Sequence, residues 1–240
     1  MELSKAKPST AGNGRKAPAQ ERIIMAAYDL FSRFGVRAVS VDQVIAQSGV
    51  AKATLYRHYP TKDHLVLAFM RRREEIWTRD WLQREVESLG SSPGKRLLAV
   101  FDVFDKWFHK PNFDGCAFVN VMIESNCADR VIRPAAIFHL TTIRKFLEQI
   151  AREAGITDPE GFGWKWHILM KGSIIAAGEG DRNAARRARE IGQLLLAEEG
   201  IDISEDAGAG KASSRAIRKT RPARGKKSVG RRSIGSAPAA

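Results

Sequence analysis

Residues 50–64 read VAKATLYRHYPTKDH and predict a short helix over residues 52–58, a stop, and a second helix start. The short helix ends before Pro60, because the residue that precedes a proline is disfavoured in the helical region. Thr61 is suited to cap the next helix, which begins at Lys62. Only Leu55 needs to face a core, so the other side chains of the short helix are available to bind something outside it.

The residues before this stretch predict two further helices and a tight turn. Over residues 20–34, apolar side chains recur along one stripe, and Gly35 follows as a C-terminal cap. Ser40 and Gln43 form a capping box that opens a helix to about residue 47, and Ser-Gly-Val follows as a turn. Two helices joined by such a short turn form the helix-turn-helix unit, whose second helix lies in the DNA major groove.

The candidate DNA-binding residues supply phosphate donors, donors to base edges, and an aromatic ring for thymine methyl groups. Lys62 is expected in the first turn of a helix, where free backbone N–H groups and a cation together suit a phosphate. The candidates are Ser40, Lys52, Thr54, Tyr56, Arg57, His58 and Lys62.

Beyond residue 64 the pattern remains helical, since apolar residues recur at spacings of three and four without the strict alternation of strands. We expect helices over about residues 62–88, 93–109, 117–125, 131–154, 159–177 and 181–198. With the first three, these make about nine helices. The sequence therefore predicts an all-α fold with a first domain over residues 20–64 and a second over residues 65–204.

Most of the formal charge of +13 lies outside these two domains. Residues 1–20 contribute +3 and residues 205–240 contribute +8, which leaves +2 for the body of the chain. Residues 1–19 and 205–240 show no apolar periodicity, and we expect both to be disordered basic tails. The C-terminal tail either follows DNA phosphates without sequence preference or is a solvated segment without a role. Specific DNA recognition must therefore depend on a local group of residues in the body of the chain and not on the total charge.

The sequence does not predict an enzyme, a metal site or a cofactor. Residues 208–211, Gly-Ala-Gly-Lys, lack the spacing and preceding strand of a phosphate-binding loop, and no G-x-S-x-G, H-E-x-x-H or paired C-x-x-C occurs. His109, His139 and His167 show no metal-ligand spacing with the cysteines. We interpret Cys116 and Cys127 as small buried apolar residues, with thiol sensing as the alternative.

Nothing in the sequence predicts a membrane span or export. The longest apolar runs are far shorter than the roughly 20 residues that a span requires. The basic N-terminus is not followed by the apolar block of a secretory signal. We therefore expect a cytoplasmic, nucleoid-associated protein without membrane contact.

The second domain holds two sets of candidate residues. Aromatic side chains at helical spacing are either core or the wall of a pocket, and Asn120 and Glu124 share a helix face as either pocket groups or a structural pair. The candidate pocket residues are Trp77, Trp81, Phe104, Trp107, Phe108, Asn120, Glu124 and Trp166. The last two helices carry an apolar stripe that packs either within the chain or against another copy. The candidate interface residues are Trp164, Ala184, Ala188, Ile191, Leu194 and Leu195.

Residues 22–70 resemble the N-terminal DNA-binding domain of the TetR family of bacterial transcriptional regulators. The resemblance is carried by IMAAYDLF at 24–31, Gly35, VIA at 44–46, SGV at 48–50, TLYRHY at 54–59, and Lys62 with Asp63. It implies that Tyr56, His58 and Lys62 bind phosphates, whereas Lys52, Thr54 and Arg57 face the groove. One departure is Ala51, where the family often has a serine that caps the recognition helix, so the helix start should be weaker by roughly 1 kcal/mol.

The resemblance further implies that the second domain binds a small-molecule effector and forms a homodimer through a four-helix bundle of its last two helices. Residues 114–126, DGCAFVNVMIESN, resemble a subset of the family. We expect a homodimeric repressor of a palindromic operator in double-stranded DNA, released by an unknown small molecule. The alternative is an architectural protein that binds DNA largely without specificity through its basic C-terminal tail.

Overall fold

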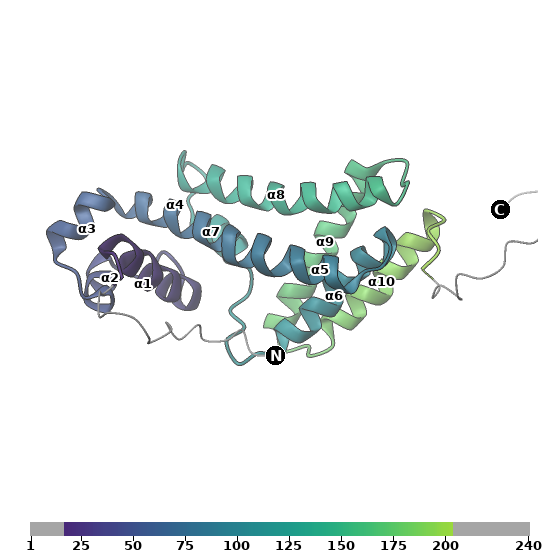
Figure 1. Cartoon of the computed structure of the whole chain (residues 1–240), viewed down its shortest axis with the longest axis horizontal. Coiled ribbons are helices and arrows are strands. Elements are labelled where there is room, and N and C mark those ends of the chain that lie inside the picture. Colours follow the sequence, from purple (N-terminus) through teal and green to yellow (C-terminus); the bar gives the residue numbers. More distant parts are fainter. Residues whose placement is uncertain (1–16, 204–240) are drawn as a thin grey trace, which may run out of the picture. The chain divides into compact units, whose positions relative to one another are not determined.

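The computed structural model describes residues 17–203, and these residues form nine continuous helices (Figure 1). The prediction of an all-α fold with about nine helices is confirmed. The tails expected over residues 1–19 and 205–240 lie outside the described residues, apart from residues 17–19. The helices are α1 (Ala19–Phe34), α2 (Val41–Ser48), α3 (Lys52–His58), α4 with η1 and α5 (Lys62–Arg73, Glu74–Gln83, Arg84–Leu89), α6 (Pro93–Phe108), α7 (Ala117–Glu124), α8 (Ile132–Glu153), α9 (Pro159–Gly178) and α10 (Ala184–Glu198).

The elements α4, η1 and α5 follow one another without a break and form one long helix whose middle, Glu74–Gln83, is π-helical. We expected the domain boundary at residues 64 and 65, which lie inside this helix. The N-terminal part of the helix packs on α1, where the ring of Phe69 meets Phe31 at 5.5 Å and Tyr28 at 5.9 Å between centroids. The two halves of the chain therefore share a rigid element instead of a linker.

The second half of the chain is a helical bundle with a largely aromatic core. α10 packs on α6 and α9, and α8 packs on α9 and α7. At the centre, Trp166 of α9 is completely buried and stacks on Phe162 at 5.3 Å, with Phe101 of α6 at 5.4 Å. α10 approaches this ring closely at Gly192, where an added Cβ would lie 2.8 Å from Trp166.

The two cysteines differ from the expectation that both are buried. Cys116 is buried at the start of α7, but Cys127 is exposed, because α7 ends at Glu124 and Cys127 lies in the loop that follows. The prediction for Cys127 is therefore wrong.

Membrane-spanning helices and groups of metal-binding side chains are both absent from the described residues. Within residues 17–203, none of the helices combines the length and the hydrophobicity needed to cross a membrane. In the same residues, His, Cys, Asp and Glu side chains form no group of three that could hold a metal ion.

Gly192→Ala should reduce the free energy of unfolding by about 1 to 3 kcal/mol, because the new methyl group overpacks the Trp166 ring. The loss should occur although alanine favours a helix more than glycine does. The control is Glu190→Ala, an exposed position of the same helix, which should change stability by no more than about 0.5 kcal/mol. Denaturant unfolding measures both, and equal stability of the two variants would contradict the close packing.

Candidate nucleic-acid interface and effector pocket

Side-chain hydrogen bonds hold the helix-turn-helix at two places, the start of α2 and the turn between α2 and α3. Ser40 and Gln43 form the predicted capping box, with the Gln43 N–H donating to Ser40 Oγ at 3.2 Å and the Ser40 N–H donating to Gln43 Oε1 at 2.7 Å. Gly49 has a φ of 62°, which a glycine adopts without strain. The Arg22 guanidinium of α1 donates to the Ser48 and Gly49 carbonyls at 2.9 and 3.2 Å. The angle between α2 and α3 is thus set by α1.

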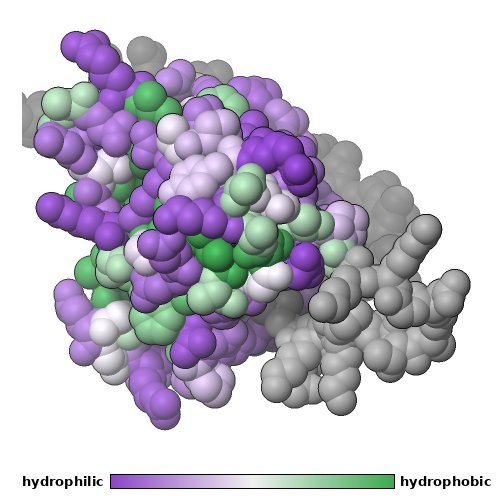
Figure 2. Space-filling model, turned by 90° about the vertical axis from the view of Figure 1, so that its left-hand side faces the viewer, coloured by the Kyte–Doolittle hydropathy of each residue, from purple (hydrophilic) through white to green (hydrophobic). Residues whose placement is uncertain are grey.

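The α3 helix has one buried anchor and an exposed polar face. Leu55 is 1% exposed, and Tyr59 just after the helix is also buried. Tyr56 is 39% exposed and Thr54 is half-buried. The remaining candidates on α3 are exposed: Lys52, Arg57 and His58. Figure 2 views the end of the molecule at which α3 lies in Figure 1, and hydrophilic side chains cover most of that face.

Three further observations complete the placement of the predicted DNA-binding residues. Lys52 forms an ion pair with Asp42 at 3.5 Å, and both side chains are largely exposed, so the pair stabilises little. Ala51 precedes α3 without a side-chain cap, whereas Thr61 caps α4 by accepting the His64 N–H at 3.2 Å. Lys62 is half-buried at the start of α4, and it lines a cavity together with Glu124 of α7.

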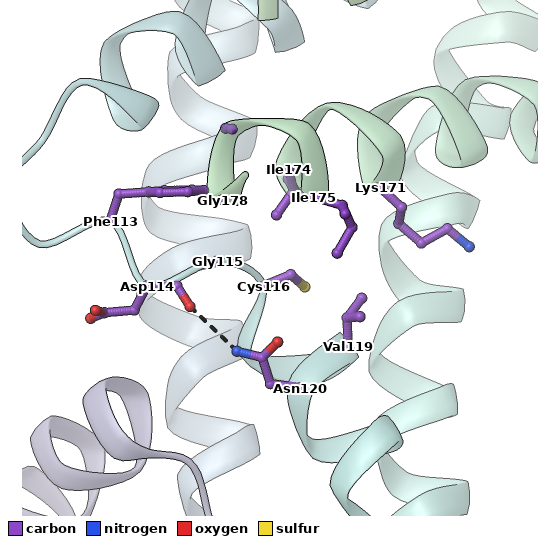
Figure 3. A pocket seen from close by; sticks show the side chains of 11 residues that line it. Phe113, Asp114, Gly115, Cys116, Val119, Asn120, Lys171, Ile174, Ile175 and Gly178 are labelled. Carbon is purple, nitrogen blue, oxygen red and sulfur yellow. Dashed lines mark hydrogen bonds between the residues drawn. The ribbon is translucent and has the colours of Figure 1, made fainter. Parts of the chain in front are cut away.

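A cavity of about 330 Å³ lies between α9 and the segment that leads into α7 (Figure 3). Most of its wall is apolar, and its polar side chains are those of Asp114, Cys116, Asn120 and Lys171. The Asn120 side-chain nitrogen donates to the Asp114 carbonyl at 3.3 Å, which leaves its oxygen free to accept. Burial raises the pKa of the Cys116 thiol, so it is neutral near pH 7. The wall residues are Phe113, Asp114, Gly115, Cys116, Val119, Asn120, Lys171, Ile174, Ile175, Ala177 and Gly178.

Of the candidate pocket residues, Asn120 lines this cavity and the other seven do not. Glu124, one turn further along α7, lines a different cavity next to the three-helix unit, which consists of α1, α2 and α3. Trp77, Trp81, Phe104, Trp107 and Phe108 form an aromatic cluster that lies behind the wall, with Trp107 touching the wall residue Phe113 at 4.9 Å. Trp166 lies in the core between α6 and α9. Sequence spacing alone could not distinguish residues of the cavity wall from residues of the hydrophobic core, because aromatic residues at helical spacing occur in both.

The candidate interface residues divide into an exposed and a buried group. Ala184 and Ala188 are buried in the same chain, and Leu195 is half-buried against the core. Trp164, Ile191 and Leu194 are exposed, with Leu194 at 71%, and Ile168 and Ile175 of α9 are exposed as well. The described surface of α9 and α10 therefore carries several large apolar side chains in contact with water.

Comparison with known proteins agrees with this arrangement. The profile of "Bacterial regulatory proteins, tetR family" matches residues 23–69, and that of "Tetracyclin repressor-like, C-terminal domain" matches residues 93–191. The chain belongs to the TetR family of bacterial transcriptional regulators, and residues 23–69 are its helix-turn-helix DNA-binding unit. The family is not an enzymatic one.

Two curated relatives match over part of the chain. The HTH-type transcriptional regulator RutR of Escherichia coli is 33% identical over 70 residues, which are 29% of this chain and 33% of RutR. The HTH-type transcriptional activator FasR of Mycolicibacterium smegmatis is 34% identical over 92 residues, 37% of this chain and 36% of FasR. The chain thus spans about a third of the length of these relatives.

Solved structures share the fold over more of the chain. The TetR-family regulator SCO4454 of Streptomyces coelicolor has a TM-score of 0.69 at 23% identity, covering 75% of this chain and 89% of that one. The regulator sav143 of Streptomyces avermitilis has a TM-score of 0.69 at 24% identity, covering 78% of this chain and all of that one.

His167, one turn before Lys171 on α9, should make stability depend on pH. Burial, with Lys171 and Arg144 nearby, lowers the pKa of His167 from 6.5 to about 3. Between these values the unfolded chain binds a proton that the folded chain does not, so stability falls as the pH falls. We expect the free energy of unfolding to decrease by about 2 kcal/mol from pH 7 to pH 5 on account of this group.

The measurement compares denaturant unfolding of the wild type and His167→Gln at both pH values. The variant should lose this share of the pH dependence, because it has no group to titrate. An identical pH dependence of the two proteins would show that His167 is not held neutral.

Proposed function

We propose that the protein is a homodimeric transcriptional repressor that leaves a palindromic operator when a small molecule binds in the cavity between α7 and α9. The observation that carries the DNA-binding part is α3, in which one buried anchor, Leu55, leaves Tyr56, Arg57 and His58 on the exposed face. A single helix of this length reads few bases. Two copies placed about 34 Å apart would read two half-sites one helical turn apart.

The exposed apolar face of α9 and α10 supports the homodimer. Trp164, Ile168 and Ile175 on α9 and Ile191 and Leu194 on α10 are large apolar side chains whose exposure is unfavourable in an isolated chain. A two-fold axis would pair these two helices with the same helices of the second copy. Ala184 and Ala188 belong to the intrachain side of α10 and would support the interface from behind.

The size and chemistry of the α7–α9 cavity support an effector site. A volume of about 330 Å³ is at the lower end of the range for small-molecule pockets. Its apolar wall and the free acceptor of Asn120 suit a small, uncharged, mainly apolar molecule that carries a hydrogen-bond donor. In Figure 3 the Lys171 ammonium points away from Asn120, although its charge still acts on the Cys116 thiol.

Selection from genomic fragments, followed by gel shift, should recover a palindromic site near the coding region of the protein itself. Tyr56→Ala and Lys62→Ala should each weaken binding by about tenfold or more, because each removes a phosphate contact from both subunits. Lys106→Ala, which removes a positive charge from an exposed position on α6, should bind as the wild type does. Unchanged binding by both Tyr56→Ala and Lys62→Ala would disprove the assigned interface.

Deleting residues 205–240 separates the repressor from the architectural alternative. The basic tail adds affinity that depends on salt and not on sequence, so its removal should lower affinity and the salt dependence together. If the protein is a repressor, the shortened chain should still prefer the selected operator over a scrambled duplex. Complete loss of that preference on deletion would favour the architectural alternative.

A further inference from the structure

Glu124, at the last position of α7, reaches the three-helix unit. Its Oε2 accepts a hydrogen bond from the Arg37 backbone N–H at 2.8 Å, and Arg37 lies in the turn between α1 and α2. The carboxylate also packs against Gly35 of the same turn, where an added Cβ would lie 2.3 Å from Oε1. Gly35 has a φ of 79°, which a glycine adopts without strain. Glycine at this position therefore permits this backbone conformation and also leaves room for the Glu124 carboxylate.

The bond between Glu124 and Arg37 differs from the other bonds that hold the three-helix unit. Arg72 donates to Glu21 at 2.5 Å and Arg73 to the Tyr28 hydroxyl at 2.9 Å, and both arginines belong to α4. Those bonds keep the three-helix unit on the long helix. The Glu124 bond instead connects the α1–α2 turn to α7, so the position of α7 constrains the turn directly.

Lys62 and Glu124 line the same cavity of about 480 Å³, together with Val36, Arg37 and Asp63. Burial lowers the pKa of Lys62, and the carboxylates of Glu124 and Asp63 oppose that change. Lys62 is also the residue expected to bind a DNA phosphate at the start of α4. The Glu124 carboxylate therefore acts on the charge of Lys62 from the same cavity, without forming an ion pair with it.

The opposite end of α7 forms part of the proposed effector site. Cys116, Val119 and Asn120 line that cavity, and Glu124 follows Asn120 by one turn, about 6 Å along the axis. One short helix thus lies between the cavity and the DNA-binding unit.

We propose that Glu124 is a positioning residue for DNA binding, which ties the α1–α2 turn to α7 and whose negative charge, in the same cavity as Lys62, weakens the attraction of Lys62 for a DNA phosphate. This inference rests on the proposed function. Its consequence is that a displacement of α7 reaches the recognition unit through the Arg37 bond as well as through α4, and that the free protein binds DNA less tightly than its basic residues allow.

The charge of Glu124 is tested with Glu124→Gln, which retains an acceptor for the Arg37 N–H but carries no negative charge to act on Lys62. At low salt the variant should bind the selected operator about three to ten times more tightly than the wild type, since the positive potential at Lys62 rises in both subunits. Glu87→Gln, an exposed acid on α5, is the control for net charge. In a Lys62→Ala background the gain should disappear. A gain that equals that of Glu87→Gln, or that persists without Lys62, would overturn this effect of the Glu124 charge.

The tether is tested without DNA, by hydrogen exchange of the Arg37 amide. Glu124→Ala should speed this exchange at least tenfold, whereas Glu124→Gln should leave it within about threefold of the wild type. Amides within α1 and α8 report whether the variants remain folded. Slow exchange of Arg37 in a folded Glu124→Ala protein would overturn the tether. Because this readout needs no operator, its failure is separate from failure of the wild type to bind DNA.

Discussion

The packing of Phe69 on α4 against Phe31 and Tyr28 on α1 is the contact on which the rest of the structure depends. It buries the apolar stripe of α1 and fixes the three-helix unit on the long helix. Since α1 in turn holds the α2–α3 turn through Arg22, the orientation of α3 follows from this contact. The long helix then continues through its π-helical segment into the second half of the described chain without a break.

The two halves of the molecule use different chemistry for different tasks. The DNA-binding half has a minimal core, with Leu55 as the single buried residue of α3, so that a short helix can expose nearly all its polar groups. The second half devotes its aromatic residues to a dense core around Trp166 and Trp107. The small α7 helix is shared, because its first turns border a cavity and its last residue bonds to the DNA-binding half.

The helix ends and the turn of the N-terminal half could be predicted from the sequence, because the residues that determine them act on close neighbours in the chain. Ser40 with Gln43, Gly49, Pro60 and Thr61 each act on neighbours within a few residues, and the structure has the capping box, the turn and the helix ends where these residues require them. Wall residues of the cavity could not be predicted in this way. Phe113, Ile174 and Ile175 come together from α9 and the segment before α7, and no local pattern distinguishes them from Trp107 behind them.

By itself, the sequence determined that the protein is all-α, about where its helices begin and end, and that residues 52–58 form the second helix of a helix-turn-helix unit. Caps, prolines and apolar periodicity act over short distances along the chain, so they can be read without a fold. Only the tertiary structure decided that Glu124 bonds to Arg37, 87 positions away in sequence, and that Lys62 lines the same cavity as Glu124. Such contacts depend on how α7 meets the α1–α2 turn, which is set by the packing of whole helices and not by any one segment.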